Sequence, residues 1–385
     1  MKENKPRRVI FFVRRIGPYH HARFQEASKL LDLVVVETRS ASQEYTWEFL
    51  AKGSYKIERL PLSSNPESGL HGNDLTNAIV DIFNRHDTDV VVTTGWADQE
   101  YHAVVLEASQ RNIPRIVISD SRFEDEPRKF YKELLKKLIL KSYSSALVAG
   151  TSARNYLLKL GFRSQSIFQP WDVVDNDHFH SKSAPATFNE RYFLCVSRFI
   201  PKKNLETLID SYASYRKEGG KRKLVLAGSG ELEPRLRAQA SAPGPGDYLD
   251  MPGFVQYDAL PELYSRALCL IFPSTSDQWG LVVNEAMAAG LPVIVSSNCG
   301  CAGDLVKESE NGFIFDPFNG AELTRLLLQM DSVGEKAWME MSEKSKLQIS
   351  NWGLGQFARG LASAVDHAVE HPRSAISFIH KILAR

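Results

Sequence analysis

Cysteine is scarce in this sequence: the 385 residues include only Cys195, Cys269, Cys299 and Cys301. Folds that depend on disulfides are short and rich in cysteine, so four scattered cysteines in a long chain exclude a disulfide framework and predict a reducing compartment. Cys299 and Cys301 are separated by one residue, but a second pair of ligands at the spacing of a zinc site is missing. We therefore expect no bound metal.

Long apolar runs are also missing. No stretch approaches the ~18 consecutive apolar residues of a membrane-spanning helix. The first apolar segment, Val9–Val13, is shorter than the ~7–15 residues of a signal-peptide core, and no small-residue cleavage site follows it. These absences predict a cytoplasmic protein that is at most peripheral on the inner face of the cell membrane.

An excess of one charge sign is absent too. The 47 basic and 46 acidic side chains give a net charge of +1, which creates no global field toward nucleic acid, and no nucleic-acid partner is expected. What the sequence does have is length. A chain of 385 residues exceeds one ordinary core and fits two domains of ~150–200 residues each.

Short β-branched runs alternate with helical patterns along the whole chain. Several of these runs are almost continuously apolar, as expected of parallel strands that are buried on both faces. The alternation predicts an α/β fold with two Rossmann-like domains. The expected strands are Val9–Val13, Leu33–Thr38, Val90–Thr93, Ile116–Ile118, Ala146–Val148, Phe193–Val196, Lys223–Ala227, Leu268–Phe272 and Pro292–Val295.

A polar segment interrupts the alternation at Ser181–Glu190, where SKSAPATFNE has no periodicity and precedes a new strand. We place the hinge there. The predicted domains are residues 1–182 on the acceptor side, residues 190–365 on the donor side, and a C-terminal helical segment at 366–385. Ser374–Arg385 predicts a short amphipathic packing helix that can cross back to the first domain, with one apolar face made of Ile376, Ile379 and Leu383.

Two cations follow the first strand of the second half. Arg198 and Lys203 flank a turn that precedes a helix, and a diphosphate needs such cations together with free backbone N–H groups. A solvated basic turn is the alternative. After the next strand, Gly228 and Gly230 would let backbone N–H groups approach an anion. The third glycine of the dinucleotide motif is missing, so a simple tight turn is the alternative here.

Two acids follow a later strand. Asp277 lies in a loop after Phe272, and Glu285 lies inside an otherwise apolar helix that begins near Gly280. Burial of a carboxylate is costly unless the group is partnered. The vicinal hydroxyls of a sugar would be suitable partners, and protein donors are the alternative.

Taken together, SRFIPKKN, LAGSGEL and PSTSDQWGLVVNEAMAAGLPVIVS resemble the C-terminal half of the retaining glycosyltransferases of family 4, which have the GT-B fold. That family has an Arg and a Lys five residues apart, followed by two acids separated by seven residues. The segments PGFVQYDALPELYSRA and NGFIFDPFN are also similar to the family, and GPYHHARF and SALVAGTSARNYLLKLGF in the first half match it more loosely. The four positions that match in order and spacing are Arg198, Lys203, Asp277 and Glu285.

The resemblance implies a role for each matched position. Arg198 and Lys203 would bind the donor diphosphate and stabilise the leaving group. Glu285 would hold the ribose hydroxyls, and Asp277 a hydroxyl of the transferred sugar. The implied donor-binding set also includes Gly17, Gly228, Gly230, Phe254, Val255, Gln278, Trp279, Gly280 and Leu281.

Two positions depart from the family pattern. Asp277 stands where the family usually has Glu, so the sugar contact would be longer or bridged by water. The family often has a His after the fourth strand of the first domain, whereas the strand here ends in Asp120-Ser121. Asp120 is the candidate catalytic residue for that place, and His20 and His21 near the Gly17 loop are alternatives.

Three further segments have charge patterns of interest. Asp87-Thr88-Asp89 resembles the metal motif of the other large glycosyltransferase fold, but it precedes a strand, which is the wrong end for a ligand. Asp172–Asp177 lacks the spacing of a calcium-binding loop. Arg128–Lys141 is basic and amphipathic, which predicts either a packed surface helix or contact with an anionic membrane. Its apolar stripe comprises Phe130, Leu134, Leu138 and Ile139.

The sequence thus predicts a metal-independent, retaining glycosyltransferase that needs no cofactor besides its donor substrate. The expected donor is a UDP- or GDP-sugar, and the expected acceptor is a glycan, a lipid-linked sugar or a small molecule. A nucleotide-sugar epimerase on the same fold and a non-catalytic nucleotide-sugar-binding protein are the alternatives. A nicotinamide dehydrogenase is disfavoured, because the complete glycine motif with its downstream acid is absent.

Overall fold

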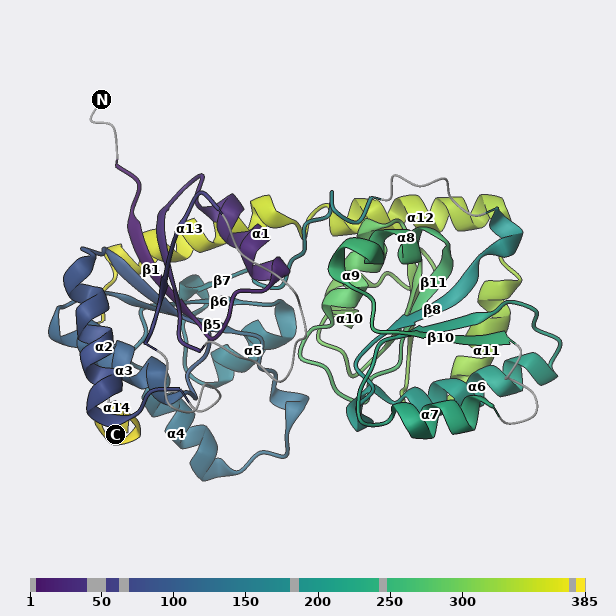
Figure 1. Cartoon of the computed structure of the whole chain (residues 1–385), viewed down its shortest axis with the longest axis horizontal. Helices are drawn as coiled ribbons and strands as arrows, with labels where there is room; N and C mark the ends of the chain where they lie inside the picture. Colours follow the sequence, from purple (N-terminus) through teal and green to yellow (C-terminus); the bar gives the residue numbers. More distant parts are fainter. Residues whose placement is uncertain are drawn as a thin grey trace. The chain divides into compact units, whose positions relative to one another are not determined.

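The structure is a computed structural model that describes residues 5–39, 53–61, 69–180, 187–241, 248–373 and 379–384. The chain packs as two compact units: unit 1 comprises residues 1–173 and 354–385, and unit 2 comprises residues 174–353. Each unit has one parallel β-sheet with helices on both faces (Figure 1). The predicted α/β class with two Rossmann-like domains is confirmed.

The described strands of unit 1 form a seven-stranded sheet in the order β3-β2-β1-β4-β5-β6-β7, with every pair parallel. Its strands are β1 (Arg8–Val13), β2 (Asp32–Glu37), β3 (Lys56–Arg59), β4 (Val90–Thr93), β5 (Arg115–Ser119), β6 (Ser145–Val148) and β7 (Ile167–Phe168). Its helices are α1 (Pro18–Ala27), α2 (Gly72–Arg85), α3 (Gln99–Gln110), α4 (Phe130–Leu140), α5 (Thr151–Lys159), α13 (Leu354–Glu370) and α14 (Ile379–Leu383).

Strand β1 shows why these apolar runs become central strands. Ile10 and Phe12 pack in the cluster that includes α2 and α3, whereas Phe11 points to the other face and meets Phe24 of α1 at a ring distance of 4.8 Å. Because successive side chains of a strand point to opposite faces, helices on both sides require a continuously apolar strand.

Unit 2 repeats the same plan. Its described strands form a six-stranded parallel sheet in the order β10-β9-β8-β11-β12-β13. The strands are β8 (Tyr192–Val196), β9 (Leu224–Ala227), β10 (Leu249–Gly253), β11 (Ala267–Phe272), β12 (Val293–Ser296) and β13 (Gly312–Phe315). The helices are α6 (Leu205–Lys217), α7 (Glu233–Ala240), α8 (Leu260–Ser265), α9 (Leu281–Ala288), α10 (Ala302–Leu305), α11 (Gly320–Asp331) and α12 (Glu335–Ile349).

The packing of α13 differs from the predicted domain boundary at residue 365. This helix lies along α1 and along strands β5, β6 and β7 of unit 1, and its apolar face is buried there, with Phe357, Leu361 and Val365 all 0% exposed. The chain therefore returns to unit 1 at residue 354. In the C-terminal segment, α14 contains Ile379 and Leu383, whereas Ile376 and hinge residues 181–186 lie outside the described residues.

Candidate active site

The two central strands of unit 2 define a topological switch point. Strand β8 lies between β9 and β11, so the chain proceeds from β8 toward one edge of the sheet and from β11 toward the other. Open α/β sheets bind their ligands at such a point, outside the carboxyl ends of the strands. Arg198 and Lys203 follow β8, and Asp277 follows β11.

Lys203 and Asp277 meet across this switch point. The ammonium group of Lys203 forms an ion pair with the carboxylate of Asp277, and the two side chains are 12% and 14% exposed. The same ammonium lies 4.8 Å from the centre of the Phe272 ring. The sequence predicted that these two residues share a site, and the structure brings them into direct contact.

Asn204 holds the loop after β8 against the loop after β11. It adopts a left-handed backbone with φ of 56°, and its amide nitrogen donates to the carbonyls of Pro273 (3.1 Å) and Pro317 (2.8 Å). The backbone N–H of Thr275 donates to the carbonyl of Lys202 at 2.8 Å. These bonds fix the backbone around Lys203, so its position does not depend on the ion pair alone.

The loop that contains Asp277 is also fixed by its backbone. Its N–H donates to the carbonyl of Asn298 (3.3 Å), and its carbonyl accepts from the N–H of Gly300 (3.0 Å). The side chain of Asn298 in turn donates to the carbonyl of Thr275 at 3.0 Å. The carboxylate of Asp277 therefore projects from a loop that is anchored to the segment after β12.

Helix α9 begins directly after this loop, at a position that requires glycine. Gly280 has φ of +106°, and a Cβ there would lie 2.5 Å from Cε1 of Phe272. The preceding residue, Trp279, is buried, donates from Nε1 to Asn284 at 2.8 Å and stacks on Trp352. Trp279 thus faces the interior of unit 2 and fixes the first turn of α9, with the backbone of Gly280 and Leu281 at the helix N-terminus.

Glu285 is 1% exposed within α9. Its carboxylate accepts a hydrogen bond of 2.6 Å from the hydroxyl of Tyr264, which lies on α8. The sequence left open whether a ligand or a protein donor partners this buried acid. The structure provides a protein donor, and the proposed contact with ribose would be additional to it.

Gly228 and Gly230 hold two loops of unit 2 close together. A Cβ at Gly228 would lie 1.8 Å from the carbonyl oxygen of Ser197, and one at Gly230 would lie 2.6 Å from that of Phe199. The N–H of Gly228 donates to the carbonyl of Gly253 at 2.8 Å. That N–H is therefore used within the protein, and Gly228 acts here as a close-packing residue beside Arg198.

The remaining predicted residues of unit 2 lie on the same loops. Arg198 lies two residues after the end of β8 and is half-buried, whereas Gln278 is exposed in the Asp277 loop. Phe254 directly follows β10 and is 40% exposed, and Val255 beside it is half-buried. An aromatic side chain exposed at the carboxyl end of a strand is available to a flat ring such as a nucleobase.

In unit 1, Gly17 and Asp120 follow strands β1 and β5. The N–H of Gly17 lies 3.4 Å from Nδ1 of His20. Burial, together with the nearby charge of Arg23, lowers the pKa of His20 to about 3. His20 is therefore neutral at physiological pH, and its ring is a structural partner of the Gly17 loop.

Arg23 is a buried charge that the sequence analysis did not identify. It is 2% exposed, donates to the carbonyl of Val173 at 2.9 and 3.0 Å, and pairs with Asp172 at 3.3 Å. Burial lowers the pKa of Arg23, and the carboxylates of Asp172 and Asp120 oppose that shift. The only sequence signal was an arginine inside the first helix, one turn after the histidines.

The four cysteines are free and buried. Burial raises the pKa of Cys195 to about 12 and that of Cys301 well above its ordinary value, so these thiols are unreactive. Among the described residues, no group of three or more His, Cys, Asp or Glu side chains could hold a metal ion. No helix in the described ranges is long and apolar enough to cross a membrane.

Comparison with known proteins finds a family match within unit 2. A family model described as "Glycosyl transferases group 1" matches residues 177–346. A GDP-mannose-dependent α-(1-6)-phosphatidylinositol monomannoside mannosyltransferase of Mycobacterium tuberculosis is 32% identical over 158 residues, which cover 37% of this chain and 41% of that protein. The matches span about two fifths of the length of the first curated relatives.

Solved structures are similar over almost the whole chain. A glycosyltransferase from Rickettsia africae has a TM-score of 0.76 at 15% identity and covers 95% of this chain and 99% of its own. The Anabaena protein HepE in complex with UDP has a TM-score of 0.72 at 15% identity and covers 93% of this chain and 99% of its own. At this identity the likeness establishes the fold. The chain therefore has the GT-B fold of two Rossmann-like domains, and its residues 177–346 match the model of the glycosyl transferases group 1 family.

Proposed function

We propose that this protein transfers a sugar from a UDP- or GDP-sugar to an acceptor, with retention of configuration and without a metal ion. The observation that supports this proposal most directly is the Lys203–Asp277 ion pair at the switch point of unit 2. Lys203 is partly buried, the backbone around it is held by hydrogen bonds, and its ammonium group pairs with Asp277 of another loop. Such a cation is pre-organised to bind a diphosphate.

Each side chain of the site has a distinct task in this proposal. Lys203 and Arg198 bind the diphosphate and offset the negative charge that develops on the leaving group. The N–H groups at the start of α9 add the positive end of the helix dipole. Asp277 holds Lys203 in place before the donor binds and then contacts a hydroxyl of the transferred sugar through a water molecule. Glu285, already oriented by Tyr264, accepts from the ribose hydroxyls.

The shorter acid at 277 fits this arrangement. The side chain of aspartate is one methylene shorter than that of glutamate. At position 277 it is still long enough to contact Lys203. The contact from Asp277 to the sugar is then bridged by water, which is nearly as favourable as a direct hydrogen bond. We propose that the leaving phosphate itself accepts the proton of the attacking hydroxyl, so no side-chain base is assigned.

Two relatives support the choice of nucleotide. The mycobacterial mannosyltransferase is GDP-mannose-dependent, and the Anabaena structure contains UDP. We propose that Phe254 and Val255 contact the base, and that unit 1 binds the acceptor near Asp120. The acceptor is a glycan, a lipid-linked sugar or a small molecule.

A thermal-shift panel with UDP, GDP and ADP is the first test. A nucleotide present at about 100 times its dissociation constant should add about 2.7 kcal/mol to the free energy of unfolding. We expect UDP or GDP, but not ADP, to do so, in the presence of EDTA as well as without it. Absence of stabilisation by all three would contradict the donor site.

A product assay separates the proposal from its alternatives. The nucleotide-sugar that stabilises the protein should be consumed only with an acceptor, and the anomeric coupling in the product should match that in the donor. An isomerised donor formed without acceptor would instead indicate an epimerase. Binding without transfer or hydrolysis would indicate a non-catalytic sensor.

A further inference from the structure

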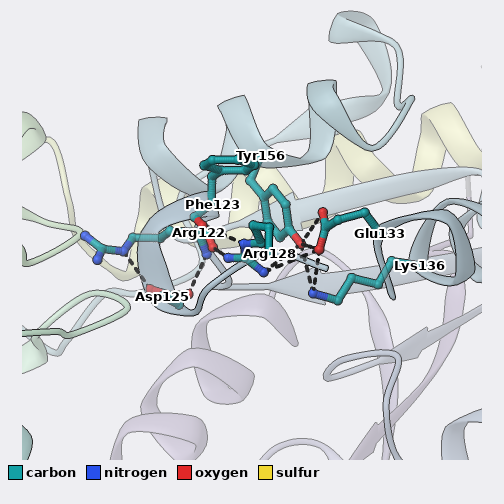
Figure 2. Close-up of polar contacts among 7 residues, drawn as sticks. All are labelled: Arg122, Phe123, Asp125, Arg128, Glu133, Lys136 and Tyr156. Carbon is teal, nitrogen blue, oxygen red and sulfur yellow. Dashed lines mark hydrogen bonds and ion pairs between the residues drawn. The ribbon is translucent and has the colours of Figure 1, made fainter. Parts of the chain in front are cut away.

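Helix α4 of unit 1 packs with its polar side toward the protein. The hydroxyl of Tyr156, on α5, donates to the carboxylate of Glu133 (2.9 Å) and accepts from Lys136 (2.9 Å) and Arg128 (3.0 Å). Glu133 also pairs with Lys136 at 3.1 Å. Figure 2 shows these side chains converging on the Tyr156 ring. Two polar residues of α4, Glu133 and Lys136, are therefore partnered on its inner side.

The segment before α4 is fixed by the same group. Arg128 donates from Nε to the carbonyl of Phe123 at 2.6 Å and lies 4.6 Å from the centre of the Tyr156 ring. Arg122 pairs with Asp125 at 2.9 Å (Figure 2). A rotation of α4 that buried its other side would have to break these charged contacts.

The outer side of α4 is apolar and exposed. Phe130 is 85% exposed, Tyr131 53%, Leu134 55% and Leu135 38%. These positions fall on one face of a helix. The apolar stripe of a surface helix normally faces the core. Along most of α4 the orientation is inverted: the apolar side faces outward, and the side with Glu133 and Lys136 faces the protein. Of the stripe noted in the sequence, Ile139 is buried and Leu138 half-buried, whereas Phe130 and Leu134 are exposed, so only the C-terminal end of this stripe packs on the protein.

Exposed lysines surround this face. On the helical wheel, Lys132 and Lys137 flank the apolar stripe on its two sides, and Lys129 and Lys141 lie at the two ends of the helix; all four side chains are exposed. Glu124 and Glu126 are the nearby exposed acids, and they lie in the preceding segment. Exposed aromatic and leucine side chains with flanking lysines are the pattern of a helix that lies in the interface of an anionic bilayer.

We propose that α4 docks unit 1 on an anionic lipid bilayer, with Phe130, Tyr131 and Leu134 inserted at the headgroup level and the flanking lysines on the lipid phosphates. A second copy of the chain fits this face less well, because pairing two such helices would bring their lysines together. The proposal does not depend on the chemistry at unit 2. It does favour an acceptor that lies in the membrane.

Vesicle flotation of the full chain tests the proposal. Phosphatidylcholine vesicles that contain phosphatidylglycerol should bind the protein at least about tenfold more tightly than pure phosphatidylcholine vesicles. The double variant Phe130→Ser/Leu134→Ser should lower that binding at least about tenfold. The matched control Met339→Ser/Leu347→Ser changes two residues of α12 that are 57% and 64% exposed, and it should bind as the parent does.

Charge is tested separately. Lys132→Ala/Lys137→Ala should weaken binding by roughly fivefold for each lysine and should make it less dependent on salt. Equal binding to both vesicle types, or a Phe130→Ser/Leu134→Ser variant that floats as well as the parent, would refute the membrane contact. Light scattering that shows a dimer lost in that variant would show that a second copy covers the face. Nucleotide stabilisation by UDP or GDP should be unchanged in all these variants, so failure here is distinguishable from failure of the donor site.

Discussion

At the scale of single residues, Lys203 is the side chain on which the proposed chemistry depends most. Its charge is partly desolvated beside Phe272 and Asp277, which makes its interaction with a diphosphate stronger than that of a surface lysine. Lys203→Ala should lower turnover by on the order of 10²–10³ while the fold is retained. The measurement is kcat with the stabilising nucleotide-sugar and its acceptor.

The neighbouring residue offers a matched control. The side chain of Lys202 is exposed. Its backbone carbonyl accepts a hydrogen bond from the N–H of Thr275, and an alanine variant keeps that carbonyl. Lys202→Ala should therefore keep near-parental turnover. Equal losses in the two variants would argue against a specific diphosphate contact at Lys203.

Glu285 gives a second prediction at this scale. Glu285→Ala should abolish the stabilisation by UDP or GDP, because the carboxylate proposed for the ribose is removed. Tyr264→Phe keeps that carboxylate and removes only its 2.6 Å donor, so it should cost about 1–3 kcal/mol in the free energy of unfolding and still respond to nucleotide. Thermal shifts with and without nucleotide measure both. An unchanged nucleotide response in Glu285→Ala would remove the ribose role.

At the scale of elements, the site depends on how closely two loops approach. Gly228→Ala should destabilise unit 2 by several kcal/mol, because the added Cβ would overlap the carbonyl of Ser197 at 1.8 Å and the backbone has φ of +143°. Gly303→Ala is the matched control, because a Cβ there meets nothing within 4 Å and alanine favours the helix. Urea unfolding should show the difference. A Gly228→Ala variant as stable as the parent would mean that the loop can move away.

The strands differ in how well the sequence predicts them. The nine predicted strands are all present, and most of them are buried on both faces. Strands β3, β7, β10 and β13 were not predicted. β3 and β10 have mixed or polar sequences with exposed positions, and β7 has two residues. All four are edge strands of their sheets, where a strand is covered less completely. Strand β13 differs from the other three, because its sequence GFIF is apolar and largely buried.

At the scale of the whole molecule, a buried histidine pair joins the C-terminal helix to the body of unit 1. His380 on α14 and His102 on α3 are 278 residues apart in the chain, and their Nδ1 atoms lie 3.0 Å apart. Nε2 of His380 is 3.2 Å from the carbonyl of Ile139. Nε2 must donate to that carbonyl, so Nδ1 of His380 accepts from His102, and both rings are neutral.

This pair predicts a loss of stability in mild acid. Burial lowers the pKa of both imidazoles to about 4. His380 adds to the shift of the His102 pKa, and the charge of Arg115 adds to that of the His380 pKa. Because the unfolded chain titrates near 6.5, it binds more protons than the folded chain between pH 6.5 and 4. The stabilisation is therefore complete above pH 6.5 and is lost as the pH falls toward 4, by on the order of 2 kcal/mol for each imidazole at pH 5.

Calorimetric unfolding at pH 8 and pH 5 tests this expectation. His380→Gln keeps a donor for Ile139 and should reduce the pH dependence. His71→Gln, at an exposed position of unit 1, should not. His20, whose pKa is also lowered by burial, titrates in the same direction, so some dependence should remain. Parental pH dependence in His380→Gln would show that the pair has no such effect.

The sequence alone determined the α/β class, the central strands and the order of the charged residues, because these depend on local periodicity and on spacing along the chain. A strand that is buried on both faces has a continuous apolar run in its sequence. A loop with a left-handed backbone position usually has glycine there. The grouping of Lys203 with Asp277 could be expected for the same reason, since both follow strands whose carboxyl ends share one edge of a sheet.

Only the tertiary structure decided which partners these residues use. Neither the hydroxyl of Tyr264 on Glu285, nor the use of the Gly228 N–H within the protein, nor the return of α13 to unit 1 follows from a sequence pattern. The inversion of α4 is the clearest case. Its periodicity is that of an ordinary packed helix, and the contacts of Tyr156 from another helix determine which side faces the protein. Periodicity fixes which residues share a face, whereas long-range contacts fix where that face points.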